Sequence, residues 1–362
     1  MSSPQSGYIP TLDGWRAVAI AAVILSHSFP SNSWASNGAL GVNLFFAISG
    51  FLITTRLADE ESARGSIALT RFYLRRVFRI QPAALVYLAA IALLAASGVI
   101  YSSRIDLLSC LLSARNYLGS DARHGWYTGH FWSLAVEEQF YLFWPAVLAF
   151  AGSRRSRWIA PGLAMAFAVW RSLDLRHAWV ANLLHNELMR NYPIRSDYRM
   201  DALLWGCALA LFARKRGSGR PGRPLSGKIG SPLAVSVLAV VIALNVYQPR
   251  GYMLAQAVLM PLPLISTVSQ SAGWLGRCLE SPPLRWVGRL SYSLYLWQQL
   301  FFSQYHHGTL QRFPANLLCV LAAACGSYYF VEKPCIRWGR RLLAEPQIQG
   351  RQAPLPALAA AR

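Results

Sequence analysis

The sequence predicts an all-α fold, a polytopic integral membrane bundle of about ten transmembrane helices with cytoplasmic N- and C-termini. Of its 362 residues, 54% are hydrophobic and only 14% are charged, whereas soluble domains contain about 25% charged residues. Apolar runs of the length that a bilayer requires, roughly 17–25 residues, recur along the chain. Lysine and arginine gather between these runs, as they do where charge sets membrane topology.

The apolar segments follow one another with polar or basic stretches between them. They cover residues 12–30, 40–57, 80–101, 130–151, 158–174, 199–213, 232–247, 252–270, 289–305 and 313–335. Several are short or carry charges, so other helices rather than lipid must cover their polar groups. Pro261 and Pro263 lie inside the eighth segment and predict a kink or a break there.

The orientation follows from the positions of lysine and arginine. With the N-terminus inside, 24 of the 35 basic residues fall in the inner segments and 10 in the outer ones, and positive residues are enriched on the cytoplasmic side. Residues 1–10 lack a basic region and Arg16 interrupts the first apolar run. We therefore expect the first segment to be a retained anchor rather than a cleaved signal peptide.

The domain organisation is expected to be simple. Residues 1–340 are predicted to form one transmembrane domain, and residues 341–362, rich in Pro, Ala and Gln, a disordered cytoplasmic tail. The net charge of +20 does not indicate a nucleic-acid partner, because the basic residues form no groove or stripe with interleaved aromatic residues. The six cysteines show no CxxC pair and no His/Cys ligand spacing, so neither a metal site nor a disulfide framework is expected.

The first segment carries Arg16 and His27 on one face. The two residues are eleven positions apart, which is about three turns plus ~20° and roughly 16 Å along a helix. Charges inside a bilayer normally face a cavity or a partner. Both side chains are therefore expected to point into one cavity, Arg16 near the cytoplasmic end and His27 in the outer half. The alternative is a snorkelling arginine and an interfacial histidine.

Arginines gather at the inner mouth of the third segment, in RFYLRRVFRIQP. Arg76 and Arg79 share a helical face and suit the clamping of phosphate oxygens, with Arg75 beside them. A nucleotide-bearing cytosolic donor such as coenzyme A is the expected ligand. Positive-inside topology by itself is the alternative explanation for this cluster.

Glu137 lies in the fourth segment, which enters the membrane from outside. It is expected roughly 10 Å below the outer surface, close to the ~8 Å expected for His27. A carboxylate beside a histidine can hold the imidazole in one tautomer, as a general base requires. Glu138 points about 100° away and is the competing carboxylate. The alternative is that Glu137 only neutralises an arginine.

Three further residues are predicted to contact an acceptor that enters from outside. Arg199 and Asp201 begin the sixth segment, and Asn43 lies in the second. The first two could instead form a local interfacial pair. Asn43, together with Ser49 and Gly50, could instead serve helix packing. The Glu332–Lys333–Pro334 sequence is typical of an inner-face helix terminus and favours a structural role.

Seven segments, in this order, resemble membrane acyltransferase family 3, which includes O-antigen and exopolysaccharide O-acetylases. They are LDGWRAVAIAAVILSHS, GVNLFFAISGFLI, FYLRRVFRIQP, FWSLAVEEQFYLFWP, YRMDALLWG, GRLSYSLYLW and FVEKP, between residues 12 and 334. The resemblance implies acyl-CoA, usually acetyl-CoA, as the cytoplasmic donor. It also implies acylation of a hydroxyl of a cell-surface polysaccharide, glycolipid or related glycoside by a protein of the bacterial inner membrane.

The resemblance further implies that the Arg16–His27 and Arg76–Arg79 pairs are essential and places Glu137 at the acid of an SLxxE motif. Similar proteins often read YLWH where this chain has YLWQ, with Gln298, so a role of that histidine is not carried over. The extracytoplasmic SGNH-type domain of some relatives is not seen, so a later transfer step is expected to use a separate protein or not to occur.

These observations favour a mechanism in which His27, oriented by Glu137, removes the proton of the acceptor hydroxyl. An acyl-histidine intermediate is an open variant. The rival function is a transporter or flippase of a glycan or lipid precursor without covalent chemistry. Against it, the two halves of the sequence show no corresponding interrupted half-helices. The acceptor, the acyl chain length and the oligomeric state stay open.

Overall fold

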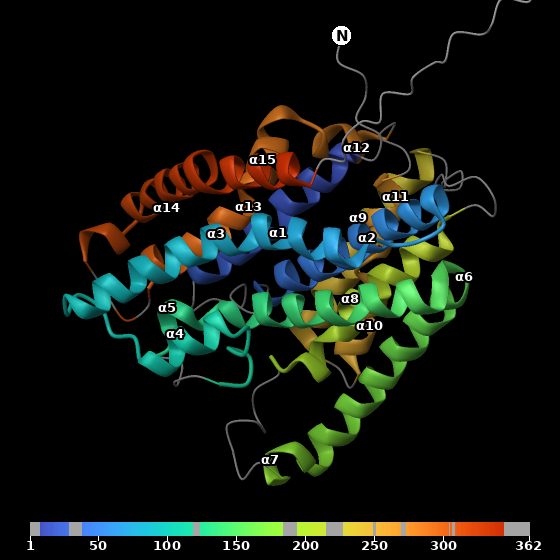
Figure 1. Ribbon diagram of the computed structural model, residues 1–362, viewed down its shortest axis with the longest axis horizontal. Helices are drawn as coiled ribbons and strands as arrows, with labels where there is room; N and C mark the ends of the chain where they lie inside the picture. The colour runs from blue at the N-terminus through green and yellow to red at the C-terminus, as the bar shows by residue number, and fades with distance from the viewer. Residues whose placement is uncertain are drawn as a thin grey trace, which may run out of the picture.

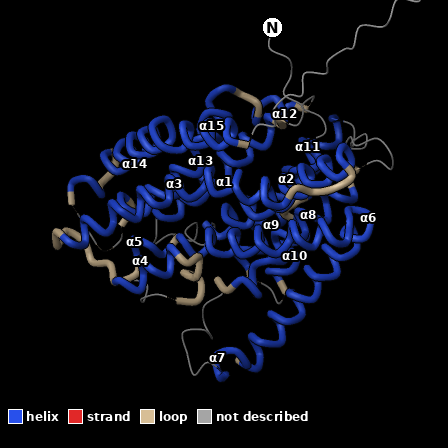
Figure 2. Tube along the Cα trace, in the orientation of Figure 1, coloured by secondary structure: helices blue, strands red, loops and turns tan. Residues whose placement is uncertain are grey.

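The computed structural model describes residues 8–28, 38–118, 124–183, 194–214, 227–248, 251–268, 273–303, 305 and 308–343. In these ranges the chain folds into helices joined by turns and short loops, and none of it forms a strand (Figure 2). The predicted all-α class is confirmed for this part of the chain. The long helices lie side by side as one bundle (Figure 1).

In chain order, the helices are α1 (Pro10–Ser28), α2 (Gly38–Arg64), α3 (Leu69–Ala96), α4 (Arg104–Leu111), α5 (Trp126–Gly129), α6 (Phe131–His177), α7 (Trp179–Leu183), α8 (Ser196–Phe212), α9 (Gly227–Tyr247), α10 (Tyr252–Leu259), α11 (Leu262–Val268), α12 (Trp274–Leu279), α13 (Pro282–Phe301), η3 (Thr309–Gln311), α14 (Ala315–Gly326), η4 (Ser327–Glu332) and α15 (Lys333–Leu342). The predicted tail begins inside the last turn of α15, and its residues 344–362 lie outside the described residues.

Each predicted apolar segment overlaps one or more helices in its described residues, but the boundaries differ in an informative way. Helix α3 begins at Leu69 and not near residue 80. The arginine-rich stretch that was predicted to precede the span is therefore its first turns. Hydropathy marks only the part of a helix that lipid would cover, whereas the backbone hydrogen bonds continue beyond it.

The fourth and fifth segments form two helical halves of α6 that meet at a sharp kink. Gly152 has φ 74° and ψ 159°, a conformation that glycine adopts without the steric cost of a side chain. Figure 1 shows the second half of α6 running back toward α7. The eighth segment is also divided, into α10 and α11, with Pro261 between them. The predicted break there is confirmed, because proline cannot donate the backbone hydrogen bond that would continue the helix.

Four helices are long and apolar enough to cross a membrane. They are Gly38–Arg64, Leu69–Ala96, Gly230–Tyr247 and Ala315–Leu342. This is what an integral membrane protein requires. The count of about ten spans and the cytoplasmic position of both termini stay predictions.

Basic residues from three helices meet at one end of the bundle. Gly339 of α15 packs directly on the side chain of Phe78, and the rings of Phe78 and Trp338 lie 5.4 Å apart. The basic helix α15 therefore lies against the arginine-rich first turns of α3. Arg56, near the end of α2, lies at the same end, since it lines a hollow together with Gly339. This grouping is what a positive-inside arrangement predicts.

Small residues bring the central helices into close contact. A Cβ atom on Gly288 of α13 would overlap the carbonyl oxygen of Asp13 in α1. Gly50 of α2 lies equally close to the Leu203 carbonyl of α8, and Gly206 of α8 lies close to Ala47. Such contacts are typical of packed membrane helices. Gly50 therefore serves helix packing, which was the alternative explanation for it.

We expect Gly50→Val to destabilise the protein because the new side chain meets backbone atoms of α8 that cannot move aside. Overpacking of this kind costs about 1–3 kcal/mol or more. The matched control is Gly162→Val, since a Cβ at Gly162 meets nothing within 4 Å. Thermal unfolding in detergent, followed by the monodisperse fraction on size exclusion, measures the effect. Equal unfolding temperatures for the two variants would contradict this close packing.

Candidate active site

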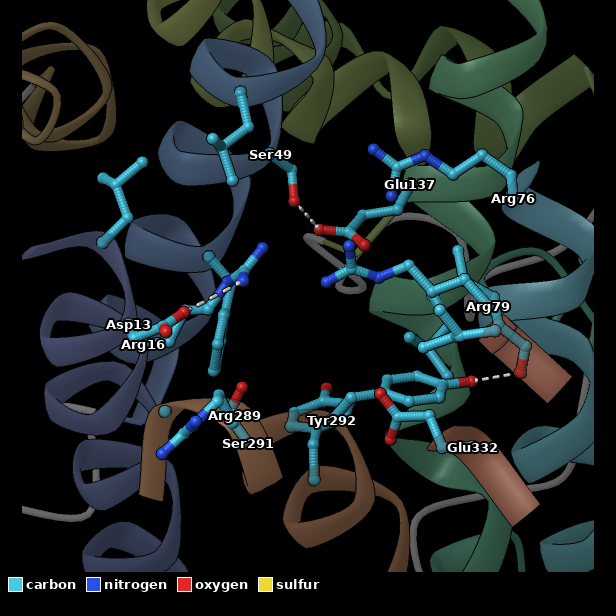
Figure 3. Close-up of a pocket in the computed structure, with 18 of the residues that line it drawn as sticks. Asp13, Arg16, Ser49, Arg76, Arg79, Glu137, Arg289, Ser291, Tyr292 and Glu332 are labelled. Atoms are coloured by element: carbon cyan, nitrogen blue, oxygen red, sulfur yellow. Dashed lines mark hydrogen bonds and ion pairs between the residues drawn. The ribbon is translucent and has the colours of Figure 1, made fainter. Parts of the chain in front are cut away.

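A cavity of about 300 Å³ lies between α1, α2, α3, α6, α13 and η4 (Figure 3). A second hollow of about 400 Å³ adjoins it toward α15. The two share a set of basic side chains, namely Arg56, Arg76, Arg79 and Arg340. The cavity is thus continuous with the basic end of the bundle, where a cytoplasmic ligand is expected to enter.

Arg16, Arg76 and Arg79 all line this cavity. Figure 3 shows Arg16 and Arg79 extending into it from opposite walls, α1 and α3. Arg16 lies 3.7 Å from Asp13, one turn earlier on the same helix, and its side chain is 19% exposed. The structure therefore brings together three arginines that the sequence singled out from two separate helices.

The cavity carries an excess of positive charge. Six arginines and four carboxylic acids line it. Guanidinium groups are weakly hydrated and match phosphate oxygens in a bidentate way, so they are the side chains of choice for partly buried phosphates. The donor set fits a nucleotide-bearing ligand better than a neutral one.

Arg75 lies apart from the other two predicted donor-binding residues. Its guanidinium is 3.6 Å from Glu60, its side chain is 45% exposed, and it lines only the outer hollow. Arg76 and Arg79 line both hollows. The three-residue spacing puts the latter two on one helical face, and Arg75 points elsewhere.

Glu137 belongs to the arginine cavity. It accepts hydrogen bonds from Ser49 Oγ, at 2.8 Å, and from the Tyr141 hydroxyl, at 3.0 Å. The guanidinium carbon of Arg76 lies 4.5 Å from the centre of the Tyr141 ring. The Glu137 carboxylate therefore helps to hold the cavity wall next to Arg76. Glu138 lines the same cavity.

The structure does not bring His27 and Glu137 into contact. The His27 ring meets Trp126 edge-on with centroids 5.6 Å apart, and Trp126 lies four residues before His130 in the chain. His130 directly precedes α6, so Glu137 lies about two turns, roughly 10 Å, further along that helix. The predicted pairing was based on the rise along each helix, which says nothing about how two helices are shifted against each other.

The three predicted acceptor-binding residues divide into a pair and a single residue. Arg199 donates to Asn43 Oδ1 at 3.4 Å. Its guanidinium carbon lies 5.4 Å from the centre of the Trp132 ring. Asp201 instead forms an ion pair with Arg171 at 2.8 Å, and both side chains are buried. Arg199 and Asn43 stay together as a candidate polar site, whereas Asp201 joins α8 to α6.

We expect Asp201→Ala to lower stability rather than acceptor affinity. It would leave Arg171, which is only 4% exposed, as a buried charge without this partner, and such losses cost about 3–5 kcal/mol. Asp59→Ala is the control, because its ion pair with Arg214 is 44% exposed on the aspartate side and is worth at most ~1 kcal/mol. The measurement is the yield of folded protein after mild heating, compared between Asp201→Ala and Asp59→Ala. A well-folded Asp201→Ala protein with weaker acceptor binding would reverse this assignment.

Sequence reasoning missed three residues of the cavity and underrated a fourth. Tyr141 follows Glu137 by four residues, and this helical spacing could have identified it. Arg56 and Arg340 enter the site only through tertiary packing. Glu332, assigned a structural role, lines the cavity from the π-helical η4 segment and accepts a hydrogen bond from Ser293 at 3.1 Å. Within the described ranges, no group of three His, Cys, Asp or Glu residues is arranged to hold a metal ion.

Comparison with known proteins adds an independent finding. The family model described as "Acyltransferase domain" matches residues 9–332. The chain is 32% identical to the peptidoglycan O-acetyltransferase OatA of Listeria monocytogenes over 80% of its own length and 49% of that protein. It is 31% identical to YrhL of Bacillus subtilis, provisionally named a peptidoglycan O-acetyltransferase, over 92% of its own length and 56% of that protein. An O-acetyltransferase of Staphylococcus aureus strain COL, also provisionally named, is 29% identical over 93% of the chain and 58% of that protein.

The chain therefore spans about half the length of the curated relatives it matches. No solved structure gives a significant match.

Proposed function

Because the chain belongs to acyltransferase family 3, whose model covers residues 9–332, we propose that it is a membrane O-acyltransferase of the bacterial inner membrane. It moves an acetyl group from cytoplasmic acetyl-CoA to a hydroxyl of a cell-surface glycan. The names of the relatives support acetyl as the group and peptidoglycan as one candidate acceptor. Other surface polysaccharides and glycolipids share the same hydroxyl chemistry.

The observation that carries the proposal is the convergence of Arg16, Arg76 and Arg79 in one positively charged cavity. These residues would hold the phosphates of the donor. Hydrogen bonds between arginine and phosphate are charge-assisted and frequently bidentate, so they fix position as well as supply affinity. The continuity of the cavity with the basic end of the bundle supports entry of the donor from the cytoplasm.

His27 is the proposed general base. It lies on α1 about 16 Å further along the helix than Arg16, at the opposite end from the arginines. Its imidazole would take the proton of the acceptor hydroxyl while the hydroxyl oxygen attacks the thioester carbon. The carbon–sulfur bond then breaks, and the proton passes from the imidazolium to the departing thiolate. If the imidazole attacks first, the acyl group rests on His27 before the hydroxyl takes it.

The proposal is tested with the purified full chain in proteoliposomes, supplied with acetyl-labelled acetyl-CoA on one side and soluble peptidoglycan fragments on the other. Label should appear on the fragments as an alkali-labile ester that requires both substrates. A second acceptor, an acetyl-free capsular polysaccharide, separates the acceptor classes. Movement of either glycan across the membrane without label on it would favour the rival transporter and overturn the assignment as an enzyme.

A further inference from the structure

The part of the cavity that lies away from the arginines is uncharged. Ser49, Glu137 and Ser291 line the cavity from α2, α6 and α13 (Figure 3). Arg56 and Arg289 line it on the basic side of the two serines. About one turn in the other direction on each helix, the lining residues are uncharged, namely Phe45, Phe46, Ser133, Leu134 and Tyr295. The cavity therefore changes from basic to largely apolar along its length.

Three of these side chains, from three different helices, meet and close the apolar end of the cavity. The Tyr295 hydroxyl lies 2.6 Å from Ser133 Oγ, within hydrogen-bond distance, and donates to the His130 backbone carbonyl at 3.1 Å. The Tyr295 ring meets the Phe45 ring edge-on with centroids 6.3 Å apart. Tyr295 and Ser133 are both buried. We call Phe45, Ser133 and Tyr295 the closed end of the cavity.

The closed end lies on the side of the cavity that faces His27. The rings of Tyr295 and His130 lie 5.5 Å apart, and His130 directly precedes α6. One turn beyond Tyr295 on α13, the Gln299 backbone carbonyl accepts a hydrogen bond from the Trp126 indole at 2.9 Å. The Trp126 ring meets His27 edge-on. A donor whose phosphates bind at the arginines would therefore extend its far end toward the closed end.

We propose that the closed end receives the acyl group of the donor and restricts it to a short chain. This inference rests on the proposed function and adds to it the size of the transferred group. Arginines suit the phosphates of the donor, whereas apolar surface stabilises the alkyl part of an acyl group. A longer chain would have to displace the Phe45 ring, or the Tyr295 ring together with its hydrogen bonds. Phe45 and Tyr295 are therefore specificity residues of this site.

The first test compares kcat/KM for acetyl-CoA and butyryl-CoA in the wild-type chain and in Phe45→Ala. The wild type should favour acetyl-CoA. One methylene in an apolar pocket changes kcat/KM by about 10–200-fold, so removal of the ring should lower the acetyl-over-butyryl ratio about tenfold or more. Phe167→Ala is the matched control. Phe167 of α6 is also partly buried against the same apolar core as Phe45, but it does not line the cavity, so its ratio should equal that of the wild type.

The second test, Tyr295→Phe, keeps the ring and removes its hydroxyl. A longer chain that moves this ring then breaks no hydrogen bond. The acetyl-over-butyryl ratio should therefore fall by about two- to tenfold, the factor that one neutral hydrogen bond is worth. Tyr73→Phe is the control, because the Tyr73 hydroxyl also donates to a backbone carbonyl at 3.1 Å, that of Leu142, away from the cavity lining. Its ratio should stay at the wild-type value.

A wild-type ratio in folded Phe45→Ala or in folded Tyr295→Phe would overturn the proposal, as would a wild type that uses butyryl-CoA as well as acetyl-CoA. If Phe45→Ala fails to fold, Phe45→Leu decides, since it keeps an apolar side chain but removes the ring.

Binding without an acceptor separates this proposal from the proposed function. The dissociation constants of acetyl-CoA and butyryl-CoA, measured by titration calorimetry, should show the same direction of change in Phe45→Ala as the kcat/KM ratio. A wild-type protein that transfers no label contradicts the proposed function. In that case, the dissociation constants still decide whether the closed end holds the acyl group, and a ratio of these constants that Phe45→Ala leaves unchanged would overturn this inference.

Discussion

His27→Ala should abolish transfer of the labelled acetyl group while leaving the protein folded in the membrane. The side chain is the proposed base, and removal of a general base lowers kcat by about 10²–10⁴-fold. His27 lies outside the central apolar core, at the end of α1, and its ring meets the edge of Trp126. Stability should therefore change much less than activity.

The measurement is the initial rate of label transfer at saturating donor, together with the unfolding temperature. His177→Ala is the matched control, because His177 lies near the end of α6 and stacks on Trp179, far along the chain from the site. It should transfer label at the wild-type rate. Transfer by His27→Ala within threefold of the wild type would remove His27 from the mechanism.

Arg79→Ala should raise the KM for acetyl-CoA by about 10- to 100-fold. A hydrogen bond to a charged group contributes roughly 1.5–3 kcal/mol, and about 1.4 kcal/mol corresponds to a factor of ten. Arg79 extends into the cavity opposite Arg16 (Figure 3). It lines both hollows along the expected donor path. Arg79→Lys keeps the charge but loses the planar guanidinium group. Its KM for acetyl-CoA should therefore lie between that of the wild type and that of Arg79→Ala.

The control for Arg79 is Arg337→Ala, an exposed arginine on the basic helix α15. If general positive charge attracts the donor, Arg79→Ala and Arg337→Ala should change the KM for acetyl-CoA alike. In both variants this KM should depend on ionic strength. If Arg79 binds a phosphate directly, only Arg79→Ala should change the KM for acetyl-CoA. An unchanged KM for Arg79→Ala would place the donor elsewhere, and the proposed use of this cavity would fail.

The separation of His27 from the arginine cavity constrains how a donor bound at the arginines can meet the proposed base. The donor-side charges lie near the start of α1 and the proposed base lies near its end, about 16 Å apart along the helix. Glu137 stays with the donor side, where it receives hydrogen bonds from Ser49 and Tyr141. His27 stays with α13 and the start of α6. In the proposed reaction, the acyl group at the end of the donor is the part that must reach His27.

Much of this arrangement followed from local sequence patterns. Apolar runs of bilayer length predicted the helices. The eleven-residue spacing of Arg16 and His27 predicted that both side chains point into one cavity, but only Arg16 lines it. The three-residue spacing of Arg76 and Arg79 predicted their common direction. The predictions of the helices and of the Arg76–Arg79 pair succeed because periodicity within one helix determines the relative direction and rise of its own side chains. The order of seven motifs identified the family for the same reason, since each motif is local.

Other features were decided only by the tertiary structure. The predicted pairing of His27 with Glu137 fails because α6 begins beside His27 and carries Glu137 two turns further along. Asp201 pairs with Arg171, a residue on another helix. Arg56 and Arg340 join the cavity from helices far apart in the chain. Backbone contacts at small residues such as Gly50 and Gly288 set how neighbouring helices are shifted and rotated. No pattern within a single helix records that shift, so the partners of each buried charge emerge only when the helices are packed together.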